Sequence, residues 1–215
     1  MEKTPGNSRY LIGIDEVGRG PLAGPVAVCA FLIKDESFLT NYIGPSYVKL
    51  PKLKDSKKLS KKQRKEWFDY LKVAKTEGLC DFAISFVSSV NIDKFGIAKC
   101  IQKALDESLK KVTSQELKNS SSLLYDSCYV FLDGGLHARE EYIHQETIIK
   151  GDELYPVISM ASIIAKVARD RVMEQYAKEY REYGFEKHVG YGTRAHYLAI
   201  KTHGLTPIHR KTFIH

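Results

Sequence analysis

The segment that most constrains the fold of this 215-residue chain is an unbroken apolar run, VAVCAFLI, at residues 26–33. A strand with one face in water alternates apolar and polar residues, so a continuous apolar run predicts a strand buried on both faces. Residues 9–17 read as a preceding strand, and the glycines and prolines between the two predict a turn. The sequence therefore predicts an antiparallel hairpin in the protein interior.

Periodic apolar residues continue after the hairpin and predict alternating helices and strands. Ser60 and Gln63 form the capping-box pattern of a helix start, and Trp67 is expected in the core. The remaining predicted elements are a strand at 82–86, a helix capped by Asn91 and reaching Val112, strands at 129–132 and 146–149, and a long helix at 157–183. This order predicts an α/β fold with a mixed β-sheet flanked by helices and a helical C-terminal extension. We expect one domain over residues 1–215, in which residues 184–215 contribute to substrate binding.

Acidic residues stand at or just beyond the ends of predicted strands: Asp15 and Glu16 at the end of the first, Asp133 and Asp152 after later ones. Sites in open α/β sheets gather at strand ends. Four carboxylates without a His or Cys cluster favour Mg²⁺ or Mn²⁺ over zinc. Two such ions can share carboxylates and promote an in-line displacement at phosphorus. The alternative for the first pair is a salt-bridged turn, with Glu16 paired to Arg19.

The loop after Glu16 has the composition of an anion-binding segment. Gly18 and Gly20 let backbone N–H groups approach a ligand closely, and Arg19 adds a forked donor that suits phosphate. Tyr191 lies between two glycines near the C-terminus and is a candidate for stacking on a base or a sugar. Together with the acids, these residues predict a phosphoryl substrate bridged by metal.

A basic segment, residues 49–65, holds eight lysines and one arginine against one acid. Lys57 and Lys58 within it are candidate contacts to a phosphate backbone, and the alternative is a solvated loop and helix face. The net charge of +7 and the pI of about 9.1 also favour a polyanionic partner. Asp170, on the predicted long helix, is expected to pair with neighbouring arginines.

The composition disfavours other classes. The four cysteines lack zinc-site spacing, the first residues lack the apolar core of a signal peptide, and no run of about 18 apolar residues is present. We therefore expect a cytoplasmic protein without membrane association.

These motifs together resemble the ribonuclease HII family. The blocks that carry the resemblance span residues 10–213 in family order and are GIDEVGRGPLAGPV at 13–26, DSKKLS at 55–60, DG at 133–134, KGD at 150–152, ASIIAKVARD at 161–170, GYGT at 190–193 and PIHR at 207–210. Their wording is similar to bacterial rather than archaeal members, and the chain has no room for the additional N-terminal domain of the related ribonuclease HIII.

The resemblance implies an RNase H-like fold and a monomer with an acidic metal-binding set of Asp15, Glu16, Asp133 and Asp152. It implies that the backbone of residues 18–20 reads the 2′-hydroxyl of a ribonucleotide while Tyr191 packs on the following deoxyribose. Family enzymes cut the RNA strand of RNA/DNA hybrids and nick duplex DNA on the 5′ side of embedded ribonucleotides, leaving 3′-hydroxyl and 5′-phosphate ends. The same cofactors, Mg²⁺ or Mn²⁺, are expected here.

Three positions depart from the family pattern: Val189, where a lysine is usual, Met160 and Gly135. None belongs to the acidic set. Two other functions compete with the nuclease: a catalytically weak protein that binds hybrids through its basic surface, and another RNase H-like enzyme that cuts DNA. Metal-dependent cutting beside a ribonucleotide separates all three.

Overall fold

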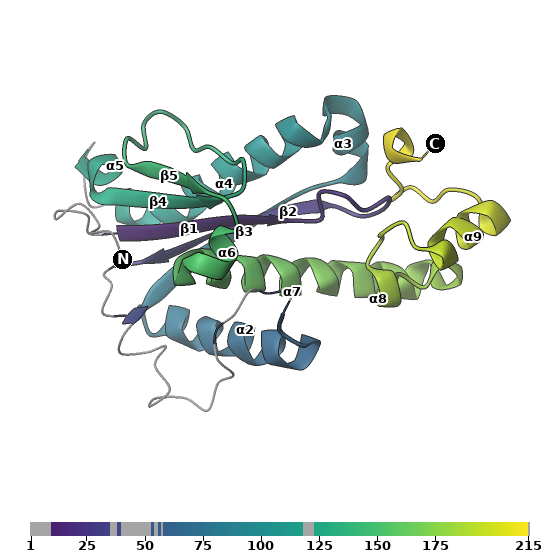
Figure 1. Ribbon diagram of the computed structural model, residues 1–215, viewed down its shortest axis with the longest axis horizontal. Helices are drawn as coiled ribbons and strands as arrows, with labels where there is room; N and C mark the ends of the chain where they lie inside the picture. The colour runs from purple at the N-terminus through teal and green to yellow at the C-terminus, as the bar shows by residue number, and fades with distance from the viewer. Residues whose placement is uncertain are drawn as a thin grey trace.

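The structure is a computed structural model that describes residues 10–34, 38–39, 53, 56, 58–117 and 123–214. Its centre is a five-stranded sheet in the order β3-β2-β1-β4-β5 (Figure 1). The predicted hairpin is confirmed, because β1 pairs antiparallel with β2. β3 is antiparallel to β2, whereas β4 and β5 continue the sheet in parallel. The strands are β1 (Tyr10–Val17), β2 (Val26–Ile33), β3 (Cys80–Val87), β4 (Cys128–Asp133) and β5 (Gln145–Ile148).

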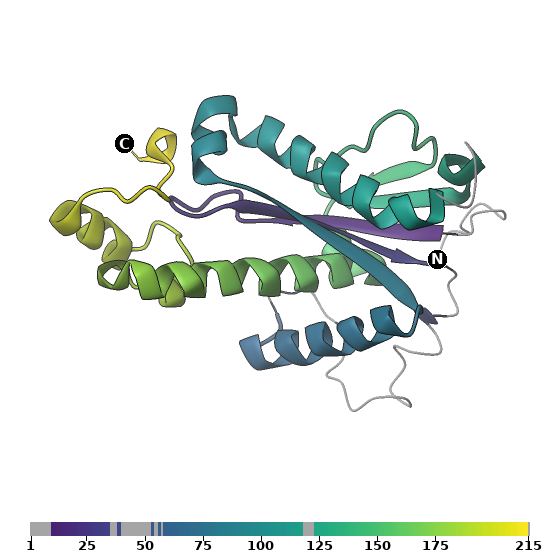
Figure 2. The same ribbon diagram turned by 180° about the vertical axis from the view of Figure 1, so that it is seen from behind.

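Helices cover both faces of this mixed sheet, as Figures 1 and 2 show from opposite sides. The helix α4 (Ile97–Leu117) covers one face, and α7 (Pro156–Glu179) covers the other, with α2 (Lys61–Thr76) beside it. The shorter elements are α3 (Ser89–Phe95), α5 (Leu123–Ser127), α6 (Gly151–Leu154), η1 (Arg181–Tyr183), α8 (Phe185–His188), α9 (Arg194–His203) and η2 (Lys211–Phe213). In the part of the chain that the structure describes, no helix is long and apolar enough to cross a membrane.

β2 is buried along its whole length because both layers of helices use it. Val28 packs in a cluster with Leu105 of α4, while Phe31 packs in a second cluster with Ile164 of α7. The adjacent strand β1 carries Gly13, and a Cβ atom there would lie 2.2 Å from the carbonyl carbon of Val157. The start of α7 therefore packs against the sheet at backbone distance.

The helix predicted from Asn91 is instead two helices. Ser88, not Asn91, caps α3, since its hydroxyl accepts the Asn91 N–H. Gly96 then takes a positive φ of 81° and separates α3 from α4. A glycine in this conformation is a common helix stop. Apolar periodicity continues on both sides of the break, which is why the sequence pattern conceals it.

The α2 prediction is confirmed in detail: Ser60 and Gln63 form both bonds of a capping box, and Trp67 is 1% exposed. The long helix also forms, although α7 ends at Glu179 and a 3-10 turn follows it. A helical extension, α8 and α9, lies at one end of α7 and is followed by η2 (Figure 1).

The turn between β1 and β2 is held by this extension. The N–H groups of Leu22 and Ala23 both donate to the Gly190 carbonyl, and the Gly24 N–H donates to the Ile208 carbonyl at 2.9 Å. In return, the Arg210 N–H donates to the Leu22 carbonyl at 2.7 Å. Two segments from opposite ends of the chain thus form one unit beside the end of β1.

Candidate active site

Two of the predicted acids lie side by side at the ends of parallel strands. The pairing of β1 with β4 runs as far as Ile14 beside Leu132. Asp15 and Asp133 are therefore the next residues of neighbouring strands, which lie about 4.8 Å apart. The two residues thus lie at the carboxyl ends of their strands, as the sequence predicted.

Asp15 is almost fully buried, at 6% exposure. Burial is the main reason that its pKa is raised well above the ordinary value, and the charges of Glu16, Asp133 and Asp152 raise it further. A hydrogen bond from Ser162 of α7 opposes these effects. The charges of the other three acids thus all act on Asp15, although the four residues come from three segments, β1, β4 and α6.

The backbone joins Asp133 to Asp152. The Gly151 N–H donates to Asp133 Oδ1 at 2.7 Å, and Asp152, the next residue, is buried in the short helix α6. Lys150, just before it, takes a left-handed φ of 58°. Few residues other than glycine adopt this conformation. It turns the chain sharply from β5 into α6 and brings Asp152 back beside the strand ends.

Glu16 diverges from Asp15, because successive residues of a strand point to opposite faces. Its pKa is raised mainly by burial, and Arg19 opposes that shift. The Arg19 guanidinium lies 3.5 Å from the Glu16 carboxylate, so the salt-bridged turn considered from sequence does form. The Arg19 side chain is 60% exposed, however, and a long, exposed ion pair of this kind contributes little stability.

The donor set fits a hydrated hard cation better than a closed metal centre. Among the described residues, no three Asp, Glu, His or Cys side chains converge on a common point. Carboxylates repel one another when no cation lies between them. Every candidate donor is an oxygen, and Mg²⁺ needs one or two carboxylates because it keeps several waters. The acids can therefore serve such an ion without the tight convergence that zinc requires.

The candidate substrate-recognition residues lie at the same end of the sheet. Arg19 and Gly20 are exposed, and Gly18 has a positive φ of 86°. Tyr191 is 43% exposed and directly follows Gly190, the residue that binds the turn. Phe185, six residues before Tyr191, is fully buried.

Sequence reasoning missed two residues of this region. Arg169 and Arg210 are both completely buried, and their guanidinium groups donate to backbone carbonyls of the turn. From sequence, the arginines beside Asp170 are expected only to pair with that acid, and Arg210 has no predicted contact. An arginine that binds carbonyls leaves no charge pattern in the sequence, so no local signal identifies it.

The basic segment borders the acids. Lys57 lies outside the described residues, and Lys58 forms a 2.9 Å ion pair with Glu153, the neighbour of Asp152. Ser56 Oγ lies 2.8 Å from Ser162 Oγ, which links this segment to the hydrogen-bond partner of Asp15.

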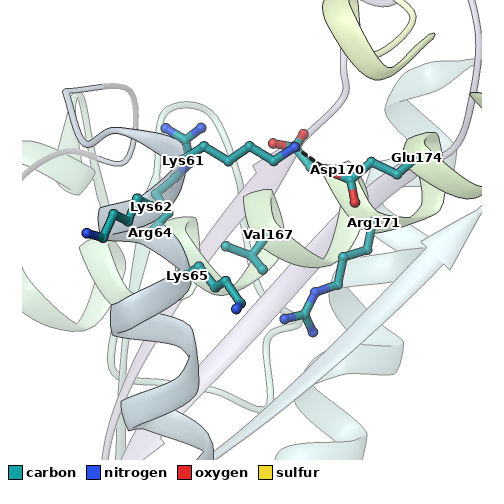
Figure 3. A pocket seen from close by; sticks show the side chains of 8 residues that line it. All are labelled: Lys61, Lys62, Arg64, Lys65, Val167, Asp170, Arg171 and Glu174. Carbon is teal, nitrogen blue, oxygen red and sulfur yellow. Dashed lines mark hydrogen bonds and ion pairs between the residues drawn. The ribbon is translucent and has the colours of Figure 1, made fainter.

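A groove of about 430 Å³ runs between α2 and α7 (Figure 3). Lys62, Lys65 and Arg171 line it, together with the ion pair between Lys61 and Glu174. Asp170 also lines the groove but pairs with Lys166 at 2.6 Å, so the arginine partner expected from sequence is wrong. The groove has a positive net charge, because five basic and two acidic residues line it.

A mixed sheet with helices on both faces, acids at the ends of β1 and β4 and oxygen donors suited to a hard cation fits the class of metal-dependent nucleases with an RNase H-like fold. Within that class, the family model for ribonuclease HII matches residues 12–215. The chain belongs to the ribonuclease HII family, whose members are endoribonucleases that act on RNA/DNA hybrids.

Individual relatives agree with this assignment. A ribonuclease HII of Clostridioides difficile is 40% identical over 205 residues, which cover 95% of this chain and 70% of the relative. Among solved structures, the RNase HII in the PCNA:RNase HII complex from Archaeoglobus fulgidus superposes with a TM-score of 0.67 at 25% identity, over 96% of each chain. The Mn²⁺ complex of Bst-RNase HIII shares the fold, with a TM-score of 0.61 at 17% identity over 93% of this chain and 64% of that one.

Proposed function

We propose that the chain nicks duplex DNA on the 5′ side of embedded ribonucleotides, besides hydrolysing the RNA strand of RNA/DNA hybrids, and leaves 3′-hydroxyl and 5′-phosphate ends. The observation that supports this proposal is the placement of Asp15, Asp133 and Asp152 at one sheet edge, next to a turn with exposed backbone at Arg19 and Gly20. One end of the molecule thus combines acids for the cut with a segment suited to sugar recognition.

Asp15, Glu16, Asp133 and Asp152 would hold the divalent ions, either Mg²⁺ or Mn²⁺. Bound there, such ions supply an activated water and charge stabilisation for an in-line displacement at phosphorus. The protein contributes positions: Gly151 orients Asp133 through its N–H, and Ser162 orients Asp15 through its hydroxyl. The Mn²⁺ complex of Bst-RNase HIII, a protein of the same fold, supports testing both ions.

Recognition of the ribonucleotide would belong to the turn and to Tyr191. Backbone N–H groups of residues 18–20 would bind the 2′-hydroxyl, which is the group that distinguishes RNA from DNA at one position. The exposed Tyr191 ring would pack on the next deoxyribose. Lys57 and Lys58 would contact the phosphate backbone, and the groove between α2 and α7 would extend that contact along the duplex.

A DNA duplex that carries one ribonucleotide tests this function. Incubation with Mg²⁺ or Mn²⁺ should give a nick on the 5′ side of that nucleotide, and EDTA should prevent it. An all-DNA duplex of the same sequence is the control. Absence of metal-dependent nicking would contradict the proposal, and equal cutting of the all-DNA control would favour a DNA nuclease instead.

We also propose that the protein acts as a monomer in the cytoplasm. The positive net charge supports the monomeric state, because like charges oppose self-association. Size-exclusion chromatography with light scattering at micromolar concentration should return the mass of one chain. A dimer mass would overturn the monomer assignment.

A further inference from the structure

Arg210 reaches the turn from the far end of the chain and holds three of its carbonyls. Its Nη2 donates to the Gly18 carbonyl at 2.6 Å, its Nη1 to the Arg19 carbonyl at 2.9 Å and its Nε to the Gly24 carbonyl at 3.0 Å. The side chain is completely buried. A buried guanidinium needs partners for its N–H groups, and here these three backbone bonds supply them.

Because the peptide bonds are trans, these contacts also fix the direction of the N–H groups on the opposite side of the turn. No peptide bond in the described residues is cis. In a trans peptide the C=O of one residue and the N–H of the next point in opposite directions. Because the Gly18 and Arg19 carbonyls point inward to Arg210, the N–H groups of Arg19 and Gly20 must point outward.

Those two N–H groups are available to a ligand. Arg19 and Gly20 are exposed, and neither backbone N–H donates a hydrogen bond to any described residue. Bonding at a carbonyl also polarises its peptide group and strengthens the N–H as a donor. The outer side of the turn therefore presents two strengthened N–H donors, and the bonds from Arg210 to the carbonyls on the inner side fix their direction.

We infer that Arg210 is a positioning residue for sugar discrimination: by binding the Gly18 and Arg19 carbonyls, it aims the Arg19 and Gly20 N–H groups at the ribose 2′-hydroxyl. This inference rests on the proposed function of the turn. It adds a residue that does not touch the substrate and yet sets the preference for ribonucleotides over deoxyribonucleotides.

Arg169 provides a matched comparison. It is also completely buried beside the same turn, and it donates to three other carbonyls, those of Pro25, Ala23 and Val189. Arg169 therefore shares the burial and the bond type of Arg210. Its side chain packs against Gly18, where an added Cβ would lie 2.2 Å from Nε, but it donates no hydrogen bond to the Gly18 or Arg19 carbonyl. Loss of stability should be similar for the two, whereas loss of discrimination should not.

The experiment measures binding to two duplexes that differ by one 2′-hydroxyl. Each variant is made in the non-cutting Asp133→Asn background, and the ratio of Kd for the all-DNA duplex to Kd for the single-ribonucleotide duplex is recorded alongside Tm. Arg210→Lys should lower that ratio by about tenfold or more, since each lost hydrogen bond is worth up to about a factor of ten. Arg169→Lys should lower Tm comparably and keep the ratio within about twofold.

A second variant separates this inference from the role of the turn itself. Gly20→Pro removes the Gly20 N–H, and an added Cβ there meets no protein atom within 4 Å. Residue 20 precedes Pro21, so it already favours the extended backbone that proline accepts. Gly20→Pro should lower the ratio.

The outcomes are distinct. A full ratio in Arg210→Lys together with a reduced ratio in Gly20→Pro would overturn the inference about Arg210 and leave the turn's role intact. A full ratio in Gly20→Pro would overturn sugar reading by the turn. If Arg210→Lys does not fold, NMR of the wild type decides: couplings across hydrogen bonds from Arg210 Nη to the Gly18 and Arg19 carbonyl carbons support the inference, and a freely rotating guanidinium contradicts it.

Discussion

Asp133 is the residue at which we expect a substitution to separate cutting from binding. Asparagine has the same shape and can still accept the Gly151 N–H through Oδ1, so the local backbone should persist. The lost charge should lower cleavage of a single-ribonucleotide duplex by more than about 100-fold, because even groups that only orient metal ligands cost about 10- to 100-fold. Duplex affinity, measured by fluorescence anisotropy, should change by less than about threefold.

A matched control is Asp106→Asn. Asp106 lies on α4 and pairs with Arg139 at 3.1 Å, on the opposite side of the sheet from α7. Its cleavage rate should match the wild type. Full activity in Asp133→Asn would remove Asp133 from the metal-binding set.

At the residue scale, the sequence identified acidic residues at strand ends, because a charged residue after an apolar run is easy to recognise. Asp15 and Asp133 end apolar strands, and an acid in that position is visible in the sequence. Arg210 was not predicted to be buried, because its partners are carbonyls that every residue carries. Its role follows from which backbone it reaches, and that depends on the folded turn.

Gly13 controls how closely α7 lies on β1. An added methyl would stand 2.2 Å from the carbonyl carbon of Val157, so Gly13→Ala must push the helix away from the strand. Overpacking typically costs about 1–3 kcal/mol, and a clash with backbone should reach the upper end of that range. Urea unfolding should show a lower midpoint with an unchanged slope. Gly20→Ala, which meets no neighbour, should leave the midpoint where it is.

The groove between α2 and α7 should contribute to the salt dependence of duplex binding. Lys62 and Lys65 line it, and each phosphate contact contributes about 0.9 to the slope of log K against log salt. Replacing both with glutamine should lower that slope by about 1 to 2. The control is Lys103→Gln with Lys110→Gln, which are exposed on α4 on the other face of the sheet. An equal effect of both pairs would mean that net charge, not the groove, is responsible.

At the element scale, the sequence predicted the helices and strands that follow from residue patterns. It missed two features that depend on the backbone conformation of one residue. The continuous apolar run predicted that β2 is buried on both faces, and the Ser60 capping box predicted the start of α2. The break at Gly96 was missed because helical periodicity continues on both sides of it. Likewise, the left-handed conformation of Lys150 was not predicted, because lysine rarely adopts it. This conformation brings Asp152 back toward Asp133.

The whole molecule should lose stability in mild acid through a buried chain of histidines. The Thr206 N–H donates to His209 Nδ1, so His209 carries its proton on Nε2 and can donate to His196 Nε2 at 3.1 Å; His196 Nδ1 then donates to the Tyr191 carbonyl. This arrangement needs both rings neutral. Burial lowers the pKa of His209 to about 4 and also lowers the pKa of His196.

Stability changes with pH because the folded and unfolded chains bind different numbers of protons. Between the ordinary histidine pKa of about 6.5 and the folded value of about 4, the unfolded chain binds more protons than the native one. The stabilisation is therefore complete above pH 6.5 and falls as the pH drops toward 4. Urea midpoints at pH 7 and pH 5 should show this loss. His209→Gln should flatten the dependence, whereas the exposed His203→Gln should preserve it; a wild-type slope in His209→Gln would contradict the assignment.

The binding of the β1–β2 turn by residues 190–210 also sets an order of assembly during synthesis. The hairpin is translated before residues 190–210, so its turn lacks Arg210 and the Gly190 and Ile208 carbonyls until residue 210 has been translated. A nascent chain that has already made α7 can place Asp15, Asp133 and Asp152 before the turn has acquired its shape. Translation therefore completes the strands that carry the acids before it completes the contacts that shape the turn.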